Sequence, residues 1–304
     1  MVRHYLTELD ITPDESRELL GSARSLKQDR GKTVGSSGPL AGKHVALYFE
    51  KPSVRTRTSF TVAVQELGGH VIELSSGSTK VGKGEHEEDF AKVVGRYVHA
   101  LVARVFEQKK LEGMAHTAGI PVVNALSDDR HPCQALADAQ TVLERKGRIE
   151  GIKFTYVGEG NNVAASTGLL LAALGAEVKV ASPRSMMLKP DILAAAQGLE
   201  GSLVALEDPL EAARGADVLY TDTWVSMGAE AGAEAQRKAL SAYRIDDAML
   251  KLAPKAMVMH CLPAVRGEEI TKEIMYGPQS AIWDQAENRL HAQKALLQWL
   301  LSDG

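Results

Sequence analysis

Short apolar runs alternate with stretches of helical spacing along most of this chain. The runs are rich in β-branched and aromatic residues, which is typical of strands. The predicted strands are Lys43–Phe49, His70–Leu74, Ala100–Ala103, Val122–Ala125, Phe154–Val157, Glu177–Ala181, Leu203–Leu206, Val218–Tyr220, Ala256–Met259 and Ala281–Trp283. The predicted helices between them are Thr58–Leu67, Glu88–Tyr97, Gln134–Lys146, Ala164–Leu174, Ile192–Gln197 and Asp246–Leu250, and a last one covers about Asn288–Leu301. This alternation favours an α/β fold with parallel sheets covered by helices on both faces.

The first helix has a clear start signal. Thr12 is a hydroxyl cap, Pro13 stands at the first helical position, and Glu15 follows three residues after the cap. The predicted buried stripe of this helix is Leu19, Leu20, Ala23 and Leu26.

The strand–helix pattern is doubled. Gly42-Lys43 leads into the strand that ends at Phe49, and Gly151-Ile152-Lys153 leads into the strand that ends at Val157. A division in the polar segment 146–151 predicts two doubly wound domains, residues 1–147 and 148–287. The last helix carries too much apolar surface for a solvated tail, so we expect residues 288–304 to pack back on the first domain and complete it.

Composition and charge narrow the classes of partner. The net charge of the 304 residues is -4, which provides no global field that would gather nucleic acid or an anionic membrane. Cys133 and Cys261 are too few for a disulfide framework, and no run of about 18 apolar residues or secretory leader is present. We therefore expect a cytoplasmic protein without a nucleic-acid or membrane partner, in which a local arrangement holds any bound anion.

The segment from Phe49 to Thr58 lies between a predicted strand and a predicted helix. Ligands of parallel sheets bind at the carboxyl ends of strands, and a helix start offers N–H groups with partial positive charge. Hydroxyls and guanidinium groups suited to phosphate oxygens come from Ser53, Arg55, Thr56 and Arg57. The segment therefore predicts a phosphate site, and the alternative is that Arg55 and Arg57 are solvated arginines beside a turn.

Two other phosphate motifs fail on inspection. Gly31-Lys32-Thr33 would need a glycine five residues earlier to form a P-loop, and Leu26 stands there. The segment Gly158–Val163 follows a strand as a dinucleotide fingerprint does, but Val163 replaces the third glycine and the next strand ends without a ribose-binding acid. A nicotinamide-dependent oxidoreductase is therefore only a distant alternative.

Two further segments follow predicted strands at the ligand-binding edge of a sheet. In His131-Pro132-Cys133-Gln134, a histidine and an amide can hydrogen-bond a carbonyl or carbamoyl group, or His131 makes only a local bond at a helix start. The other segment is His260-Cys261-Leu262-Pro263. The cysteines and histidines lack the spacing of zinc ligands, and the acidic run 84–89 is typical of a solvated helix start, so no metal is expected.

Taken together, these segments resemble the aspartate/ornithine carbamoyltransferase family over nearly the whole chain, and within it the ornithine enzymes. The matching motifs are Phe49-Glu50-Lys51-x-Ser53-x-Arg55-Thr56-Arg57, Gly82-Lys83-Gly84-Glu85, His131-Pro132-Cys133-Gln134-Ala135-Leu136-Ala137-Asp138, Gly160-Asn161-Asn162, Asp222-Thr223-Trp224-Val225-Ser226-Met227-Gly228 and His260-Cys261-Leu262-Pro263-Ala264. The first and third motifs imply carbamoyl phosphate binding, and the last two point to ornithine.

The resemblance implies that the carbamoyl group of carbamoyl phosphate passes to the side-chain amine of L-ornithine, giving L-citrulline and phosphate without a cofactor or metal. Residues 1–147 with 288–304 would bind carbamoyl phosphate, and residues 148–287 would bind ornithine. The implied carbamoyl phosphate residues are Ser53, Val54, Arg55, Thr56, Arg104, His131, Gln134 and Arg289. The implied ornithine residues are Asn162, Asp222, Ser226, Met227, Cys261 and Leu262. Among all of these, the resemblance implies catalytic roles for Arg55, Arg104, His131 and Cys261.

The family also lends the loop around Thr79 to the active site of a neighbouring subunit, which implies a homotrimer or a multiple of trimers. It implies a role in arginine biosynthesis. Three residues depart from the family pattern. Val54 stands where threonine is common and keeps only the backbone N–H, Glu159 replaces an aspartate, and His86 replaces a serine. A sibling carbamoyltransferase acting on N-acetylornithine, putrescine or aspartate is the main alternative.

Overall fold

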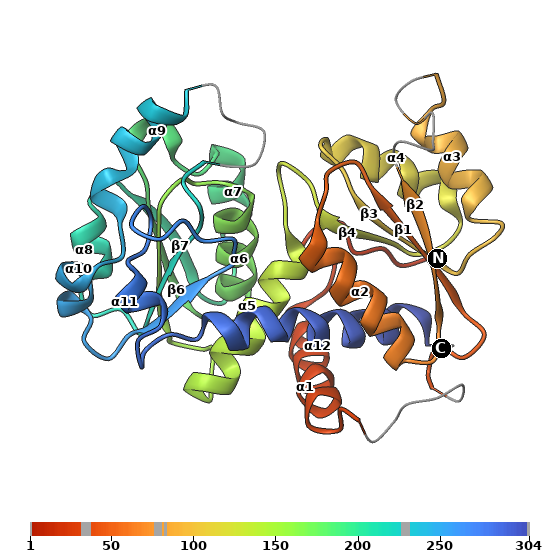
Figure 1. Cartoon of the computed structure of the whole chain (residues 1–304), viewed down its shortest axis with the longest axis horizontal. Coiled ribbons are helices and arrows are strands. Elements are labelled where there is room, and N and C mark those ends of the chain that lie inside the picture. The colour runs from red at the N-terminus through yellow and green to blue at the C-terminus, as the bar shows by residue number, and fades with distance from the viewer. Residues whose placement is uncertain (1, 32–37, 76–80, 82–83, 226–231, 303–304) are drawn as a thin grey trace. The chain divides into compact units, whose positions relative to one another are not determined.

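The computed structural model of the chain describes residues 2–31, 38–75, 81, 84–225 and 232–302. The chain divides into two compact units, one formed by Met1–Ala137 with Arg289–Gly304 and the other by Asp138–Asn288. Each unit is built on one parallel sheet, and Figure 1 shows helices packed against both sheets. The predicted α/β class with two doubly wound sheets is confirmed.

The sheet of the first unit has the strand order β2-β1-β3-β4, and each neighbouring pair is parallel. The strands are β1 (His44–Phe49), β2 (His70–Ser75), β3 (Ala100–Arg104) and β4 (Val122–Leu126). The helices are α1 (Pro13–Gln28), α2 (Val54–Glu66), α3 (Glu87–Val94) and α4 (Gln108–Ala118). Because β2 lies on one side of β1 and β3 on the other, the winding direction reverses between β1 and β3.

Helix α1 begins with the predicted capping box. The backbone N–H of Glu15 donates to the Thr12 hydroxyl over 3.2 Å, and the backbone N–H of Thr12 donates to the Glu15 carboxylate over 2.8 Å. Leu19, Leu20 and Ala23 are buried as predicted. The predicted stripe member Leu26 is only partly buried, because it lies in the last turn of the helix.

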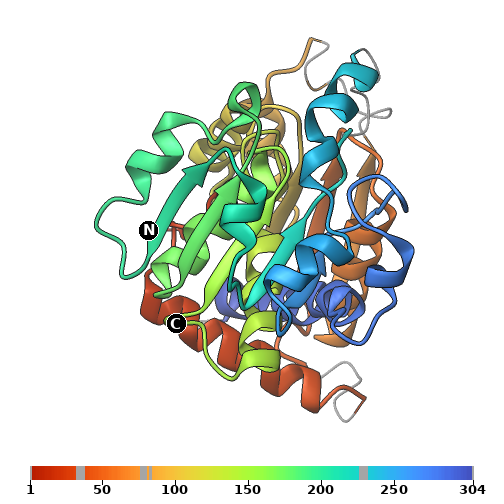
Figure 2. The same cartoon turned by 90° about the vertical axis from the view of Figure 1, so that its left-hand side faces the viewer.

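The sheet of the second unit has the order β7-β6-β5-β8-β9, again with parallel neighbours. The strands are β5 (Lys153–Val157), β6 (Glu177–Ala181), β7 (Ser202–Leu206), β8 (Val218–Thr221) and β9 (Met257–His260). The helices are α6 (Asn162–Ala173), α7 (Pro190–Ala195), α8 (Pro209–Ala213), α9 (Ala233–Leu240), α10 (Asp247–Leu252) and α11 (Lys272–Met275), with short 3-10 helices at Arg184–Met186 and Ser241–Tyr243. Figure 2 turns this unit toward the viewer and shows helices on both sides of its sheet. Its winding direction reverses between β5 and β8.

Helices α5 (Pro132–Lys146) and α12 (Ile282–Leu301) each contain one boundary between the units. The part of α12 from Arg289 onward belongs to the first unit. There Lys294 Nζ lies 2.9 Å from Glu66 Oε2, and Arg289 Nη2 donates to Thr56 Oγ1 over 3.2 Å. The prediction that the last helix packs back on the first domain is therefore confirmed.

The predicted strand at Ala281–Trp283 is wrong. Ser280 makes an isolated bridge with Val258, and the backbone N–H of Ala281 donates to Val258 O over 2.8 Å. Pairing stops there, because helix α12 begins at Ile282, which is buried, whereas Trp283 in the same turn is 49% exposed. Helix α4 is absent from the helices expected from the sequence, and it begins at Gln108 without a side-chain cap.

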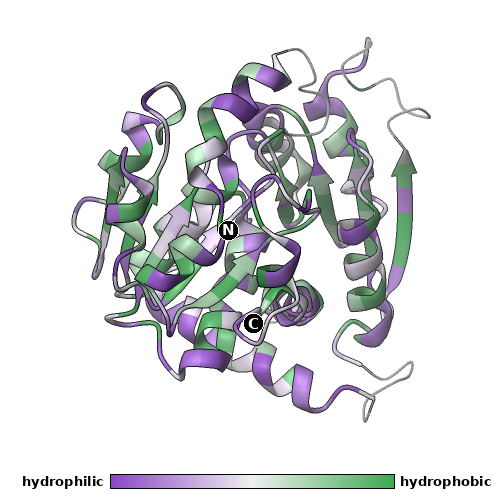
Figure 3. Ribbon diagram, turned by 60° about the vertical axis from the view of Figure 1, so that its left-hand side comes forward, coloured by the Kyte–Doolittle hydropathy of each residue, from purple (hydrophilic) through white to green (hydrophobic). Residues whose placement is uncertain are grey.

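The hydropathy pattern agrees with burial in two cores. In Figure 3 many helices are banded in green and purple along their length, as expected where one face of a helix is buried and the other is solvated. Within the described ranges, no helix combines the length and the apolar character needed to cross a membrane.

We expect the Lys294→Met substitution to lower the free energy of unfolding by about 1–3 kcal/mol at pH 7, because it removes a charged hydrogen bond to Glu66 that holds α12 on the first unit. Burial opposes ionisation of Glu66, but the hydrogen bonds and charges of Lys294 and Arg30 outweigh it and hold the pKa of Glu66 below 4.5. A lowered pKa contributes stability above that value, and the contribution disappears as the pH falls. Urea unfolding at pH 7 and pH 3 should therefore show a smaller difference from wild type at pH 3.

The matched control is Lys92→Met, which changes an exposed lysine on helix α3. It should shift the free energy of unfolding by less than about 0.5 kcal/mol. Equal losses in the two variants would show that the Lys294–Glu66 contact does not anchor the helix.

Candidate active site

The residues singled out in the sequence gather at the carboxyl ends of strands in each unit. In the first unit, β1 leads through Ser53 into α2, and Arg104 is the last residue of β3, so both flank the reversal of winding. In the second unit, Asp222 follows β8 and Cys261 follows β9. Reversal points at this edge are where open parallel sheets bind ligands.

The start of helix α2 is open to a ligand. Ser53 is the N-cap, but its side chain makes no capping hydrogen bond, and Val54 is 81% exposed. The first backbone bond of the helix runs from the Arg57 N–H to Ser53 O over 3.0 Å, so the N–H groups of Val54, Arg55 and Thr56 have no acceptor within the helix. Together with the exposed side chain of Arg55, these donors suit a phosphate group.

The second arginine of this segment is engaged elsewhere. Arg57 Nη1 lies 2.5 Å from Glu73 Oε2, and its guanidinium stacks over the Phe49 ring at 5.2 Å from the ring centroid. Arg57 therefore connects α2 to the first sheet, whereas the side chain of Arg55 is exposed.

Helix α12 brings a buried arginine to the start of α2. Arg289 is 7% exposed, and it donates through Nη2 to Thr56 Oγ1 and through Nη1 to Gln134 Oε1, the latter over 2.7 Å. Gln134 and Thr56 are each 2% exposed. The three side chains come from α12, α5 and α2 and form one hydrogen-bonded cluster in the first unit.

Arg104 adds a second buried cation to the same region. It is 8% exposed, and its Nε atom has no hydrogen-bond partner among the described residues. Burial, followed by repulsion from Arg289, lowers the pKa of Arg104 to about 10, so the side chain remains charged at pH 7. Two buried guanidinium groups that repel each other favour an anion between or beside them.

His131 is held in its neutral form. Its side chain is 5% exposed, and burial together with the charges of Arg289 and Arg104 lowers the pKa of His131 well below 6.5. A neutral imidazole can donate one N–H bond to a carbonyl oxygen without bringing another positive charge. Cys133, two residues later, is a packing residue, because burial raises the pKa of its thiol to about 12 and Sγ lies 3.3 Å from Asn124 O.

In the second unit, Asp222 is the centre of a polar cluster. Its Oδ2 accepts from Asn161 Nδ2 over 2.9 Å, and its Oδ1 accepts from Cys261 Sγ over 2.8 Å. Asn161 also caps α6, because its Oδ1 accepts from the N–H groups of Val163 and Ala164. The cluster therefore joins the ends of β5, β8 and β9.

The thiol of Cys261 acts here as a hydrogen-bond donor. Burial and the neighbouring carboxylate of Asp222 raise the pKa of Cys261 well above 9.0, so the thiol keeps its proton at neutral pH. Asp222, His260 and Cys261 each offer one atom that could bind a metal ion, and these three atoms lie within 4.8 Å of one another. Both ring nitrogens of His260 are hydrogen-bonded, however, so this cluster is arranged as a hydrogen-bonded network.

The glycine-rich loop after β5 does not fit a dinucleotide. A Cβ atom on Gly160 would lie 2.4 Å from the backbone nitrogen of Leu188, and the Gly160 N–H donates to Met186 O over 2.7 Å. Glycine is needed here because the chain itself packs against the loop, whereas a dinucleotide fingerprint uses glycine to admit a pyrophosphate.

Several expected site residues have other positions or lie beyond the described ranges. Asn162 is the first residue of α6 and partly exposed, whereas its neighbour Asn161, which belongs to the matching motif but not to the expected site residues, contacts Asp222. An asparagine directly before a helix is a strong N-cap signal that could have identified it. Leu262 follows Cys261 and is partly buried. Thr79, Ser226 and Met227 lie outside the residues that the structure describes.

Two of the departures from the family pattern have clear positions. Glu159 accepts from Gln236 Nε2 over 3.0 Å, and burial and then the charge of Asp222 raise the pKa of this glutamate. His86 is the N-cap of α3 and makes no side-chain capping bond.

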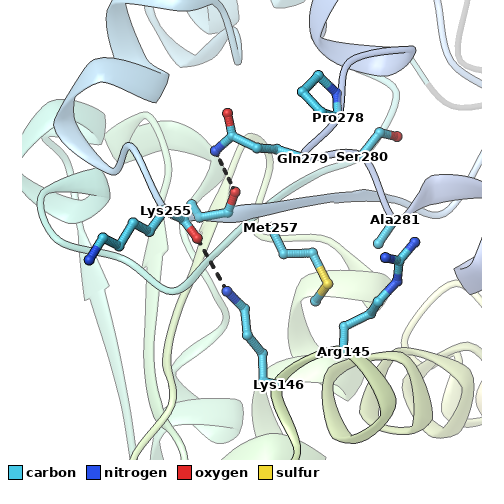
Figure 4. A pocket seen from close by; sticks show the side chains of 9 residues that line it. Arg145, Lys146, Lys255, Met257, Pro278, Gln279, Ser280 and Ala281 are labelled. Carbon is cyan, nitrogen blue, oxygen red and sulfur yellow. Dashed lines mark hydrogen bonds between the residues drawn. The ribbon is translucent and has the colours of Figure 1, made fainter.

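A separate pocket of about 170 Å³ lies in the second unit (Figure 4). It is lined by Arg145, Lys146, Lys255, Ala256, Met257, Pro278, Gln279, Ser280 and Ala281. Lys146 Nζ donates to Lys255 O over 3.3 Å, and Met257 is the first residue of β9. The pocket is therefore at the amino end of this strand, whereas Cys261 follows its carboxyl end.

Comparison with known families agrees with this geometry. The model described as "Aspartate/ornithine carbamoyltransferase, carbamoyl-P binding domain" matches residues 3–144, and the model described as "Aspartate/ornithine carbamoyltransferase, Asp/Orn binding domain" matches residues 150–300. The chain belongs to the aspartate/ornithine carbamoyltransferase family. The predicted family and the predicted carbamoyltransferase class of enzyme are confirmed.

Individual relatives match over nearly their whole length. An ornithine carbamoyltransferase from Acidothermus cellulolyticus is 49% identical over 306 residues, covering 99% of this chain and 97% of the relative. A solved ornithine carbamoyltransferase from Pyrococcus furiosus superposes with a TM-score of 0.93 at 45% identity, covering 97% of this chain and 96% of that one. That from Gloeobacter violaceus gives a TM-score of 0.87 at 45% identity, covering 99% of each chain.

The state of His131 in this carbamoyltransferase can be tested by its effect on stability. Unfolded histidine binds a proton near pH 6.5, whereas the buried ring does not, so unfolding takes up a proton below that pH. Stability should therefore fall with acidification, by up to about 1.4 kcal/mol per pH unit from this residue. In urea unfolding at pH 7, 6 and 5, His131→Gln should remove this part of the slope.

The control for this measurement is His116→Gln, which changes an exposed histidine on α4. It should leave the slope of stability against pH as in wild type. An unchanged slope in His131→Gln would show that His131 is protonated in the folded protein.

Proposed function

We propose that the chain is an ornithine carbamoyltransferase, which forms L-citrulline and phosphate from L-ornithine and carbamoyl phosphate. The Asp222–Cys261 pair carries the choice of second substrate. Its negative charge is the carboxylate of Asp222, and Glu159 lies near it. This charge suits the α-amino group of ornithine and disfavours the second carboxylate of aspartate. The names and near-half identity of the full-length relatives support the same choice.

In this proposal the first unit binds carbamoyl phosphate. The N–H groups at the start of α2, with Ser53, Val54, Arg55 and Thr56, hold the phosphate. The buried cations Arg104 and Arg289 neutralise its charge, and the neutral ring of His131 and the amide of Gln134 bond the carbamoyl group. Residues 1–147 with 288–304 form this carbamoyl phosphate domain, and residues 148–287 form the ornithine domain.

The reaction is a direct acyl transfer. The side-chain nitrogen of ornithine attacks the carbonyl carbon, and a C–N bond forms as the C–O bond to phosphate breaks. The proton that the amine loses passes to the leaving phosphate, which departs as hydrogen phosphate. Negative charge grows on the carbonyl oxygen and on the leaving phosphate, so Arg55, Arg104 and the N–H of His131 are suitable donors. Because the thiol of Cys261 keeps its proton, it positions the amine and does not attack the carbonyl.

Ornithine must react as a free amine. The reference pKa of such an amine is about 10.4, so the site has to favour the uncharged form over the ammonium ion. Asp222 and Asn162 would hold the amino-acid end, with Ser226 and Met227 from the segment beyond the described residues. Cys261 and Leu262 would lie beside the reacting amine.

The assembly and cellular setting are part of the same proposal. A homotrimer or a multiple of trimers would bring the loop around Thr79 to a neighbouring active site. The proposal also includes a cytoplasmic location and a role in arginine biosynthesis. Sedimentation equilibrium would test the trimer.

The proposal is tested by citrulline formation from carbamoyl phosphate with ornithine, and by product formation with N-acetylornithine, putrescine or aspartate. We expect ornithine to be the substrate used. Arg55→Ala should lower kcat/KM by about 10²–10³-fold, because it removes a donor to the departing phosphate. Arg57→Ala is the matched control, since Arg57 is held by Glu73, and it should lower kcat/KM by less than tenfold.

Preference for another amine would keep the carbamoyltransferase class and overturn the choice of ornithine. Equal losses in the two arginine variants would contradict the assignment of the phosphate to Arg55.

A further inference from the structure

We propose that the buried ion pair Glu8–Arg130 positions His131, because it connects the turn before this histidine to the amino-terminal segment of the chain. The inference rests on the proposed function, since it concerns the residue assigned to the carbamoyl group. All three residues belong to the first unit. Neither Glu8 nor Arg130 is itself placed against a substrate.

The amino-terminal segment extends the first sheet beyond β4. Tyr5 makes a parallel bridge with Val123, its backbone N–H donates to Val122 O over 2.9 Å, and its carbonyl accepts from the Asn124 N–H over 2.8 Å. In the strand order of this sheet, β4 stands at one edge. Because the segment runs parallel to β4, Glu8 lies near the carboxyl end of that strand, where the loop to His131 begins.

Glu8 contacts Arg130 at this place. Arg130 Nε lies 3.6 Å from Glu8 Oε1, the side chain of Glu8 is fully buried, and that of Arg130 is 15% exposed. A carboxylate removed from water needs a nearby cation, and burial strengthens the attraction between the two charges. The pair is therefore a fixed contact, whereas an ion pair on the surface is weak and easily exchanged.

Arg130 closes a turn that leads into α5. The backbone N–H of Ser127 donates to Arg130 O over 2.9 Å, and the backbone N–H of Arg130 donates to Ser127 Oγ over 3.0 Å. His131 follows directly, and its carbonyl accepts from the Gln134 N–H over 3.0 Å at the start of α5. The backbone is thus fixed on both sides of His131, so the position of Arg130 controls where the imidazole lies.

A second set of contacts holds the start of the same turn. Gln108 Oε1 accepts from Ser127 Oγ over 2.6 Å and from Asn124 Nδ2 over 3.2 Å. Asn124 Nδ2 also donates to Leu6 O over 2.9 Å, which connects this group to the amino-terminal segment. These bonds hold the turn at Ser127, and the ion pair holds it at Arg130. The ion pair is therefore the anchor adjacent to His131.

The proposed chemistry makes the placement of His131 critical. Its N–H donates to the carbonyl oxygen of carbamoyl phosphate, on which negative charge grows during the reaction. Such a hydrogen bond weakens steeply when the angle departs from linearity. The phosphate is held elsewhere, at the start of α2 with Arg55. Loss of the ion pair should therefore lower the rate of the reaction and spare the affinity for phosphate.

The test is steady-state kinetics of Glu8→Gln, in which a neutral amide of similar size replaces the carboxylate. We expect kcat at saturating carbamoyl phosphate and ornithine to fall about tenfold, because a misplaced catalytic group lowers rates by up to about 10²-fold. The dissociation constant of inorganic phosphate, measured by calorimetry, should stay within about twofold of wild type. Arg130→Lys keeps a cation and should retain more activity than Arg130→Gln.

A double substitution shows whether Glu8 acts through His131. In a His131→Gln background, Glu8→Gln should change kcat by less than about twofold, because the group that it positions is already absent. The matched control is Glu18→Gln, which changes an exposed glutamate on α1 and should leave kcat as in wild type.

The outcomes are distinguishable. Unchanged kcat in Glu8→Gln would overturn the positioning role alone. A full further loss of kcat in the His131→Gln background, or a matching loss of affinity for phosphate, would also overturn it, because either result indicates a general loss of structure. Wild-type protein that carbamoylates no ornithine would overturn the proposed function and the positioning role with it.

Discussion

Both candidate sites depend on the geometry of parallel sheets. A chain that returns to the same end of a sheet after each crossover places all of its strand ends at one edge. Residues far apart in sequence, such as Arg55 and Arg104, or Asp222 and Cys261, reach that edge within their own units. Where the winding reverses, the adjacent loops diverge and leave room for a ligand. The fold thus decides where chemistry can occur, and the side chains decide which chemistry.

The first unit brings two buried cations close enough to influence each other. Arg104 and Arg289 are each less than one tenth exposed, and Arg289 contributes to the lowered pKa of Arg104. Burial, followed by the same two charges, keeps His131 neutral. A phosphate group would relieve the repulsion, and His131 would then donate a neutral hydrogen bond. The second unit has the opposite character, because burial, followed by the negative charge of Asp222, raises the pKa values of Cys261 and Glu159.

Much of the fold and part of the candidate site could be predicted from the sequence. Local signals identified the capping box at Thr12. Ordered motifs identified the phosphate-binding segment that contains Arg55, and together they identified the family. The contacts that organise the sites could not be predicted, because they join residues distant in the chain. The bond from Arg289 to Thr56 depends on how α12 packs, and the contact of Asn161 with Asp222 depends on tertiary placement. The apolar run after Ser280 suits a strand or a helix equally, and in the structure it enters the first turn of α12.

The most direct measurement is a crystal structure with a bisubstrate analogue. In this analogue a phosphonate replaces the phosphate of carbamoyl phosphate, and the carbonyl carbon is bonded to the side-chain nitrogen of ornithine. The account predicts the phosphonate on the N–H groups at the start of α2 with Arg55, and the carbonyl oxygen within hydrogen-bond distance of His131. The amino-acid end should lie against Asp222. A phosphonate bound away from Arg55, or an ornithine moiety away from Asp222, would contradict it.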